Sequence, residues 1–197
     1  KESPALIFAR GVANIAITGS GTINGQGAHQ NFQHGNDSKG GPRRPKIIYF
    51  IGCNNVRVQD VTLRNSAYWT QDYEKCNGVI VRGVKVYSHA NWNNDGLDID
   101  SRNVVVSDCY IDCDDDALCL KSDTDTPCEN VTVTNCVLKS NCNAIKFGTS
   151  SYSGFKNVTI SNCTIDRASE EHIRQWYKNY PWIGTKHKTV VAGIALE

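Results

Sequence analysis

The segment Asn130-Val131-Thr132-Val133-Thr134-Asn135-Cys136 carries the pattern that decides the fold. Its valines and threonines alternate, as in a short β-strand that buries one face and exposes the other. An asparagine precedes the strand and another follows it, and asparagine favours tight turns because it tolerates left-handed backbone conformations. The segment therefore predicts one short strand between two turns, with Cys136 facing inward again after the second turn.

Versions of this motif recur along the chain. They are Asn14-Ile15-Ala16-Ile17, Asn55-Val56-Arg57-Val58, Asn77-Gly78-Val79-Ile80-Val81, Asn103-Val104-Val105-Val106, Asn130-Val131-Thr132-Val133 and Asn157-Val158-Thr159-Ile160. The last five begin 22, 26, 27 and 27 residues apart. A unit of this length that holds three short strands cannot bury its own apolar face, but copies stacked on one another can.

We therefore predict an all-β fold, a right-handed parallel β-helix whose coils take about 22–27 residues. The prediction covers residues 1–197 as a single domain, with the repeated asparagines forming a ladder along one turn. A β-sandwich is the alternative, and the fixed period argues against it. The last strand-like run reaches Glu197 without a polar cap. We accordingly expect C-terminal coils to be missing and unpaired strand edges at that end to promote self-association.

The overall composition gives no reason to expect nucleic acid or a membrane as a partner. The chain has 197 residues, of which 40% are apolar, and its net charge is +1. Bulk charge therefore does not favour nucleic acid or an anionic membrane surface. No apolar run approaches the roughly 20 residues of a membrane span.

Nine cysteines are a high count for a chain of this length. Cys109, Cys136 and Cys163 follow the 27-residue period, so we expect them to stack inward as small apolar residues without bridging one another. No Cys-x-x-Cys pair with a matching histidine pair is present, which argues against structural zinc. A disulfide framework is the alternative for the remaining cysteines. The open pairings are Cys53 with Cys76, or a pair among Cys113, Cys119, Cys128 and Cys142.

Two acidic segments of one pattern lie 21 residues apart. Gly96-Leu97-Asp98-Ile99 matches Ala117-Leu118-Cys119-Leu120, so Asp95 and Asp116 occupy equivalent positions. In adjacent strands these carboxylates would lie roughly 5 Å apart, with Asp115 beside them. Three acids this close are costly unless a ligand, proton or cation uses them. The spacing alone leaves open a catalytic acid–base set, an acidic turn and a calcium site.

The chain resembles family 28 glycoside hydrolases, the polygalacturonase and rhamnogalacturonase group of pectin-degrading enzymes. The matching segments follow the family's order and span most of the chain. They are Gly19-Ser20-Gly21-Thr22-Ile23-Asn24-Gly25-Gln26-Gly27, Asn65-Ser66-Ala67-Tyr68-Trp69-Thr70, Asn93-Asn94-Asp95-Gly96-Leu97-Asp98 and Asp115-Asp116-Ala117-Leu118-Cys119-Leu120-Lys121-Ser122.

The resemblance implies a right-handed parallel β-helix that hydrolyses glycosidic bonds with inversion and without a metal or other cofactor. It implies that Asp115 is the general acid and that Asp95 and Asp116 activate water. It also implies an acidic plant cell-wall polysaccharide, pectin, as the substrate and a secreted or periplasmic location. The alternative function is a non-catalytic β-helix that binds polysaccharide or serves a structural role.

Two basic features of the family are not matched in this chain. The family's Gly-His-Gly segment aligns with Cys142-Asn143-Ala144, and its Arg-Ile-Lys segment falls near Gly193-Ile194-Ala195-Leu196-Glu197. We accordingly consider His172 and Arg174 as replacements for the missing basic groups. The full set of substrate-binding candidates is Asn93, Asn143, Lys146, His172 and Arg174.

The repeat alignment places two of these candidates beside the acids. Lys146 shares a repeat position with Cys119 and Asp98, so it either binds an acidic sugar or forms an ion pair on that face. Asn143 stacks over Asp116 and is either a substrate ligand or a turn residue.

Overall fold

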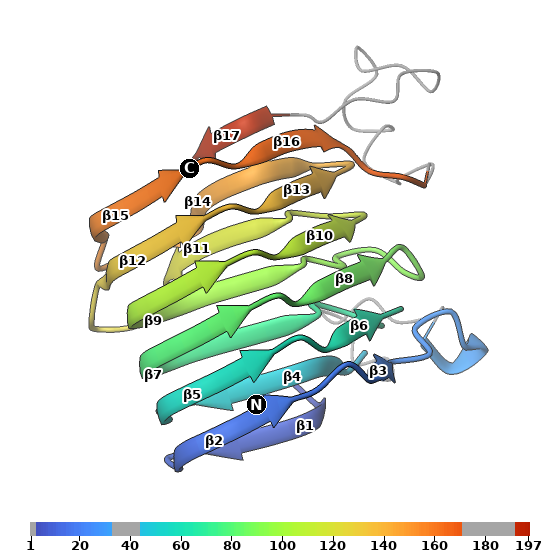
Figure 1. Cartoon of the computed structure of the whole chain (residues 1–197), viewed down its shortest axis with the longest axis horizontal. Coiled ribbons are helices and arrows are strands. Elements are labelled where there is room, and N and C mark those ends of the chain that lie inside the picture. Colours follow the sequence, from blue (N-terminus) through green and yellow to red (C-terminus); the bar gives the residue numbers. More distant parts are fainter. Residues whose placement is uncertain (1–2, 33–43, 171–191) are drawn as a thin grey trace.

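The structure is a computed structural model that describes residues 3–32, 44–170 and 192–197. This part of the chain consists of short strands and one 3₁₀ turn (Figure 1). The strands are β1 (Ala5–Arg10), β2 (Ala13–Thr18), β3 (Thr22–Asn24), β4 (Lys46–Ile51), β5 (Asn54–Gln59), β6 (Thr62–Arg64), β7 (Gln71–Arg82), β8 (Lys85–Ser88), β9 (Leu97–Ser107), β10 (Tyr110–Cys113), β11 (Leu118–Ser122), β12 (Cys128–Thr134), β13 (Val137–Ser140), β14 (Asn143–Ser151), β15 (Phe155–Ser161), β16 (Thr164–Arg167) and β17 (Ala192–Leu196), and the 3₁₀ turn is η1 (Gln30–Phe32).

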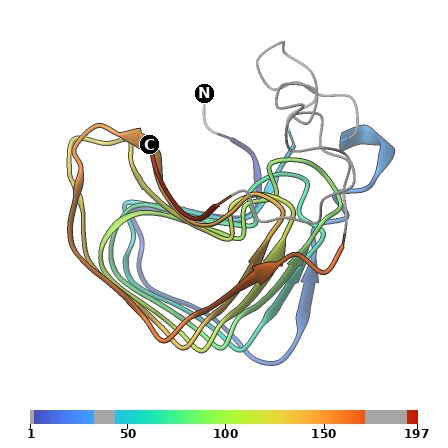
Figure 2. The ribbon, with the colours of Figure 1, turned by 90° about the horizontal axis from the view of Figure 1, so that it is seen from above.

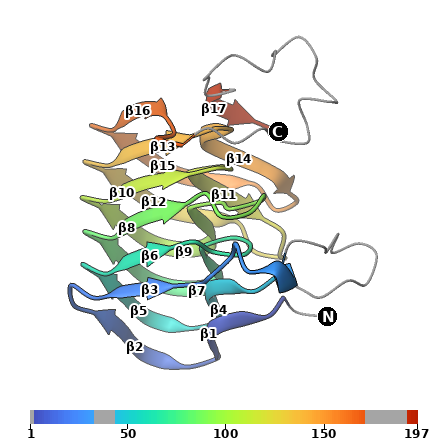
Figure 3. The same ribbon diagram turned by 90° about the vertical axis from the view of Figure 1, so that its right-hand side faces the viewer.

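The strands stack in parallel, coil upon coil. In one sheet Lys85, Tyr110, Val137 and Thr164 are register partners on successive strands. The coils superpose when the molecule is seen from above (Figure 2) and form a regular stack from the side (Figure 3). The predicted all-β parallel β-helix is therefore confirmed.

Two faces of the stack belong to one continuous sheet because β7 and β9 are long enough to serve both. The first face, which we call the front sheet, runs in the order β1-β4-β7-β9-β11-β14-β17. On the second face, β2 pairs with β5, β5 with β7, and β12 with both β9 and β15. The third face is a separate sheet in the order β16-β13-β10-β8-β6-β3.

The core lies inside the coils and follows the alternation of the sequence. Val131 and Val133 are buried, whereas Thr132 between them is exposed. Val104 and Val131 are register partners, and each is 1% exposed. Burying a valine side chain contributes on the order of 1.5–3 kcal/mol, so a column of such residues holds each coil on the next.

The predicted asparagine ladder runs along the turn that precedes the second face. Asn157 Nδ2 donates to Asn130 Oδ1 at 3.0 Å, and Asn130 Nδ2 donates to Asn103 Oδ1 at 3.0 Å. The φ angles of Asn103, Asn130 and Asn157 are 56°, 55° and 53°. Each asparagine thus supplies both the left-handed turn conformation and a hydrogen bond to the next coil.

One rung of the ladder differs from the sequence motif. Asn54 pairs with Asn77 in register, so Gly78 rather than Asn77 occupies the ladder position beside Asn55. Gly78 has φ 75°, which glycine adopts without a steric penalty. Asn77 still contributes, because Asn103 Nδ2 donates to its Oδ1 at 2.7 Å.

All nine cysteines lie within the described residues, and each is a thiol. Cys109 and Cys136 are buried and Cys163 is partly buried, and the three are not bridged to one another, as predicted. Cys53 and Cys76 are likewise not joined, although both are buried. Burial raises the pKa of the Cys76 thiol to about 12, so it behaves as a small apolar residue.

The outermost strands at both ends of the stack expose apolar side chains. Leu6 and Phe8 on β1 are 59% and 46% exposed, and Ile194 and Leu196 on β17 are 62% and 77% exposed.

The described residues contain no helix with the length and apolar character needed to cross a membrane. The single-domain organisation of residues 1–197 stays a prediction, as does self-association through the C-terminal end.

Candidate active site

Three acids come from two neighbouring turns that lead into the front sheet. Asp95 lies just before β9, and Asp116 lies just before β11. The register pairs Leu97 with Leu118, and the Gly96 amide donates to the Asp116 carbonyl at 2.8 Å. Asp95 and Asp116 therefore occupy equivalent positions on adjacent coils, as the sequence repeat predicted.

A glycine follows Asp95 because the next coil leaves no room for a side chain. A β-carbon at Gly96 would lie 2.3 Å from Cγ2 of Ile111 and 2.7 Å from the carbonyl oxygen of Ala117. Both distances are below van der Waals contact, so any other residue would push the coils apart. The close approach at Gly96 fixes where the Asp95 side chain enters the site.

Asp116 is surrounded by groups that stabilise a negative charge. Asn143 donates to Asp116 Oδ1 from Nδ2 at 2.7 Å and from its backbone amide at 3.3 Å. The Lys146 ammonium lies 3.4 Å from Asp116 Oδ2 and 3.1 Å from Glu197 Oε2. Burial lowers the pKa of Lys146, but the two carboxylates raise it by more, so it stays charged. The predicted stacking of Asn143 over Asp116 is confirmed, and Lys146 forms an ion pair on this face.

Asp115 is half-buried and held by hydrogen bonds on both carboxylate oxygens. Its Oδ1 accepts from the Asp116 amide at 3.0 Å, and its Oδ2 accepts from Asn93 Nδ2 at 3.5 Å. Asn93 Oδ1 in turn accepts from Arg44 Nη2 at 3.0 Å. Sequence reasoning found Asn93 but missed Arg44, which lies 49 residues away in the chain and outside the repeats.

Arg44 is itself fixed by the turns that carry the site. Its guanidinium carbon lies 4.9 Å from the centre of the Tyr68 ring and 5.1 Å from that of Trp92. Its Nη1 donates to the carbonyl oxygens of Ala67 and Trp92. Arg44 is 3% exposed, and a buried guanidinium with this many partners is a rigid support for Asn93.

Asp95 is the acid whose surroundings most disfavour a negative charge. It is 4% exposed, and within the described residues its Oδ1 has no hydrogen-bond partner. Burial raises the pKa of Asp95 well above its usual range, and the charges of Asp98, Asp115 and Asp116 raise it further. The Lys121 ammonium opposes this rise without cancelling it.

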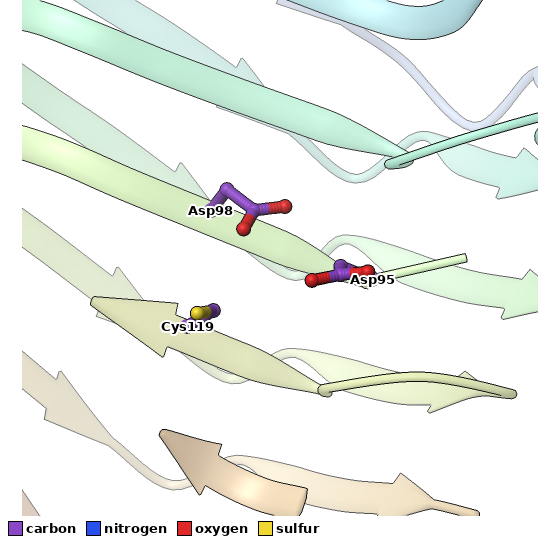
Figure 4. Close-up of side chains that lie close together, drawn as sticks. All are labelled: Asp95, Asp98 and Cys119. Atoms are coloured by element: carbon purple, nitrogen blue, oxygen red, sulfur yellow. The ribbon is translucent and has the colours of Figure 1, made fainter. Parts of the chain in front are cut away.

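Asp98 is a fourth acid of the site that the sequence reasoning did not assign. It points to the same side of β9 as Asp95, and Cys119 lies beside it on β11 (Figure 4). The Lys121 ammonium lies 3.3 Å from Asp98 Oδ1 and donates to Cys119 Sγ at 3.2 Å. Burial raises the pKa of Asp98 to about 7, although Lys121 opposes the rise. The signal was present in the repeat, where Asp98, Cys119 and Lys146 share one outward position.

Each acidic cluster has an ammonium group of its own. Two sets of potential ligand atoms each lie within 4.8 Å of one another, namely those of Asp95, Asp98 and Cys119 and those of Asp115, Asp116 and Cys142. Lys121 contacts the first set and Lys146 the second. A metal cation in either set would lie close to an ammonium ion, which is electrostatically unfavourable. The contacts therefore fit an acid–base site better than a calcium site.

The other two substrate-binding candidates, His172 and Arg174, lie outside the described residues.

Comparison with known sequences assigns the chain to a family. The sequence profile described as Glycosyl hydrolases family 28 matches residues 1–179. The chain belongs to this family. A probable polygalacturonase of Arabidopsis thaliana is 33% identical over 115 residues, which is 57% of this chain and 24% of that protein. A probable polygalacturonase of Vitis vinifera is 32% identical over 126 residues, or 61% of this chain and 25% of that protein.

A solved exopolygalacturonase structure has the same fold. The exopolygalacturonase from Thermotoga maritima superposes with a TM-score of 0.73 and 26% sequence identity, covering 84% of this chain and 48% of that one. The chain thus spans about a quarter of the plant relatives and about half of the Thermotoga chain. It is a polygalacturonase-like member of glycosyl hydrolase family 28.

Proposed function

We propose that this chain hydrolyses the glycosidic bonds of a pectin-like polysaccharide by inverting acid–base catalysis with Asp95, Asp115 and Asp116. The observation that carries the proposal is the convergence of these three carboxylates on adjacent coils, in a family of glycosidases. Inverting hydrolysis needs one protonated carboxyl group and one carboxylate on opposite sides of the scissile bond. A structural scaffold has no need for three crowded acids.

Asp115 is the general acid in this proposal. It is the least buried of the three acids, its carboxyl group is held by the Asp116 amide and by Asn93, and it carries the proton that is donated. That proton passes to the glycosidic oxygen as the bond to the anomeric carbon breaks.

Asp95 and Asp116 activate the water that attacks the anomeric carbon. Asp116 has the partners of an ionised carboxylate, since it accepts from Asn143 and faces the Lys146 ammonium. Asp116 takes the proton of the water, and Asp95, which faces the same space from the neighbouring coil, helps to orient that water. Asn93, Asn143 and Lys146 surround these acids and bind the sugar at the cleavage point. The proposal includes a secreted or periplasmic location, where pectin is accessible.

The test is the activity of acid-to-amide variants on pectic polymers. Asp115→Asn keeps the side-chain shape but has no transferable proton, so turnover should fall by on the order of 10²–10⁴-fold with the fold intact. Asp95→Asn and Asp116→Asn should also cripple turnover. Asp166→Asn is the matched control because its side chain is 58% exposed on β16, in the other sheet.

Two outcomes would contradict the proposal. Wild-type protein that releases no reducing sugar from any pectic substrate, but binds these polymers, would favour the non-catalytic polysaccharide-binding alternative. The calcium site would be favoured instead if a chelator lowered the melting temperature of the wild type and each of the three substitutions, without chelator, lowered it by a similar amount.

A further inference from the structure

A groove of about 200 Å³ lies over β4, β7 and β9, beside the proposed catalytic acids. Trp69 lines it and occupies the register position next to Asp95, since the Thr70 amide donates to the Asp95 carbonyl at 2.7 Å. Asp72, which also lines it, is the register partner of Asp98. A polysaccharide that reaches the catalytic acids along the front sheet would therefore place a neighbouring sugar in this groove. Its charged lining residues are Lys46, Lys121, Asp72, Glu74, Asp100 and Asp123.

Both lysines of the groove are already paired with buried acids. Lys46 Nζ lies 2.5 Å from Asp72 Oδ2, and these side chains are 4% and 7% exposed. Lys121 Nζ lies 3.3 Å from the fully buried Asp98. The two ammonium groups also lie 4.4 and 4.5 Å from the centre of the Trp69 ring, which holds them in place. Both ammonium groups are therefore already engaged by carboxyl groups and an aromatic ring before any ligand arrives.

The remaining charged residues of the groove are acids. Glu74 accepts a hydrogen bond from Tyr49 Oη at 2.5 Å, and Asp100 accepts from the Asp123 amide at 3.0 Å. These partners are neutral groups, so the negative charges are not cancelled. Burial raises the pKa of Asp100 to about 6, and the charges of Asp123, Glu74 and Asp72 raise it further, so like charges already meet in the groove.

From this charge distribution we propose that the groove binds an uncharged sugar residue and rejects a uronate. The proposal rests on the proposed function, because it takes the ligand to be part of the polysaccharide that is cleaved. The carboxylates of Glu74, Asp100 and Asp123 accept hydrogen bonds from sugar hydroxyl groups. A uronate carboxylate in the same place would meet like charges with no uncompensated cation among the described lining residues. The preferred substrate then carries a neutral sugar next to the cleavage point.

The test compares two ligands of the same length and linkage at neutral pH and low salt. One is an α-1,4-linked galacturonate oligomer, and the other is its carboxyl-reduced counterpart, in which each carboxylate has become a hydroxymethyl group. Affinities are measured by calorimetry with the Asp115→Asn protein, so that neither ligand is consumed. The readout is the ratio of the two dissociation constants, because it cancels effects on binding that the ligands share.

The Glu74→Gln and Asp123→Asn substitutions, made together in that background, remove two negative charges from the groove. The glutamine side chain can still accept the hydrogen bond from Tyr49, so the fold should be preserved, and the melting temperature checks this. We expect uronate binding to tighten by about three- to tenfold while binding of the reduced oligomer changes by less than about twofold. Asp166→Asn, which removes one negative charge outside the groove, should leave the ratio unaltered.

An unchanged ratio in the double variant, or failure of both oligomers to bind, overturns the proposal. Hydrolysis is scored separately with Asp115 intact. Cleavage of pectic polymers with an unchanged ratio would refute the neutral-sugar groove alone. No cleavage of any polymer, with the expected change in ratio, would refute the proposed catalysis and leave the groove's preference for uncharged sugars established.

Discussion

Asn93 and Arg44 hold Asp115 in position, so substitutions at these two residues test the role of Asp115 without changing the acid itself. Asn93 links the acid to Arg44, and Arg44 packs against two aromatic rings. A general acid must be aligned with the leaving oxygen, so a support that is loosened should slow the chemical step more than it weakens substrate binding.

We predict that Arg44→Lys and Asn93→Ala each lower kcat by about five- to tenfold, the loss expected for one hydrogen bond of about 1 kcal/mol. Lysine keeps the charge at position 44 but lacks the planar fork that reaches Asn93. If both residues act through Asp115, the double variant should be no slower than the slower single variant. Arg44→Lys should leave KM within about twofold of wild type. Additive losses in kcat, or a change confined to KM, would show that Arg44 has only a structural role.

The buried acids of the front sheet also predict a dependence of stability on pH. Burial raises the pKa of Asp100 to about 6, whereas in the unfolded chain an aspartate titrates near its ordinary pKa of 3.8. The folded state therefore binds more protons between these two pH values, and wild-type stability should fall as pH rises through this window.

Asp100→Asn should remove this loss. The variant should be more stable than wild type at pH 7–8 by on the order of 2 kcal/mol, and the difference should vanish below about pH 4. The measurement is denaturant unfolding of both proteins across that pH range. Asp166→Asn, at an exposed site, should show no such pH-dependent gain. A difference between wild type and Asp100→Asn that does not vary with pH would contradict the prediction.

At the level of the strands and turns, the asparagine ladder makes two contributions to stability that substitutions can separate. Asn130 both adopts a left-handed backbone conformation and links the side chains of Asn103 and Asn157. The rung at Gly78 shows that the left-handed conformation is required even where no side chain is present. Backbone conformation and side-chain hydrogen bonding can therefore be tested apart.

We predict that Asn130→Ala destabilises the fold by about 1–2 kcal/mol and that Asn130→Gly costs less. Alanine loses the ladder and also strains the turn, whereas glycine loses only the ladder and some unfolded-state entropy. Thermal or urea unfolding measures both. An alanine variant as stable as the glycine variant would mean that the backbone conformation contributes little.

For the molecule as a whole, the sequence repeat predicts where residues at equivalent repeat positions lie, but it does not predict contacts that involve residues outside those positions. The positions of Asp95, Asp116 and Asn143 follow from alignment of the repeats, because equivalent residues stack at a fixed register. Arg44 and the Lys46–Asp72 pair could not be found this way. Their contacts join side chains of different length on different coils, and Arg44 lies between β3 and β4, outside the repeated strands. Such contacts depend on the conformations that individual side chains adopt, and the sequence repeat does not determine these.

The two ends of the stack give the last prediction, which concerns association of whole chains. In the described residues β1 pairs with β4 alone and β17 pairs with β14 alone, so each outermost strand of the front sheet has an open edge. Both edges carry exposed apolar side chains, and parallel strands at opposite ends can continue one stack into another. We therefore expect concentration-dependent, head-to-tail self-association.

Leu196→Lys should weaken this association, because a charged side chain on an edge strand opposes pairing with another chain. Val105→Lys is the matched control: Val105 is also exposed, at 43%, but lies on β9 in the middle of the stack. Sedimentation equilibrium measures the apparent mass of the three proteins over a range of concentrations. The C-terminal edge is the interface if the mass falls for Leu196→Lys and is unchanged for Val105→Lys. A wild-type protein that stays monomeric at every concentration contradicts the prediction, since it would show that these edges do not pair between chains.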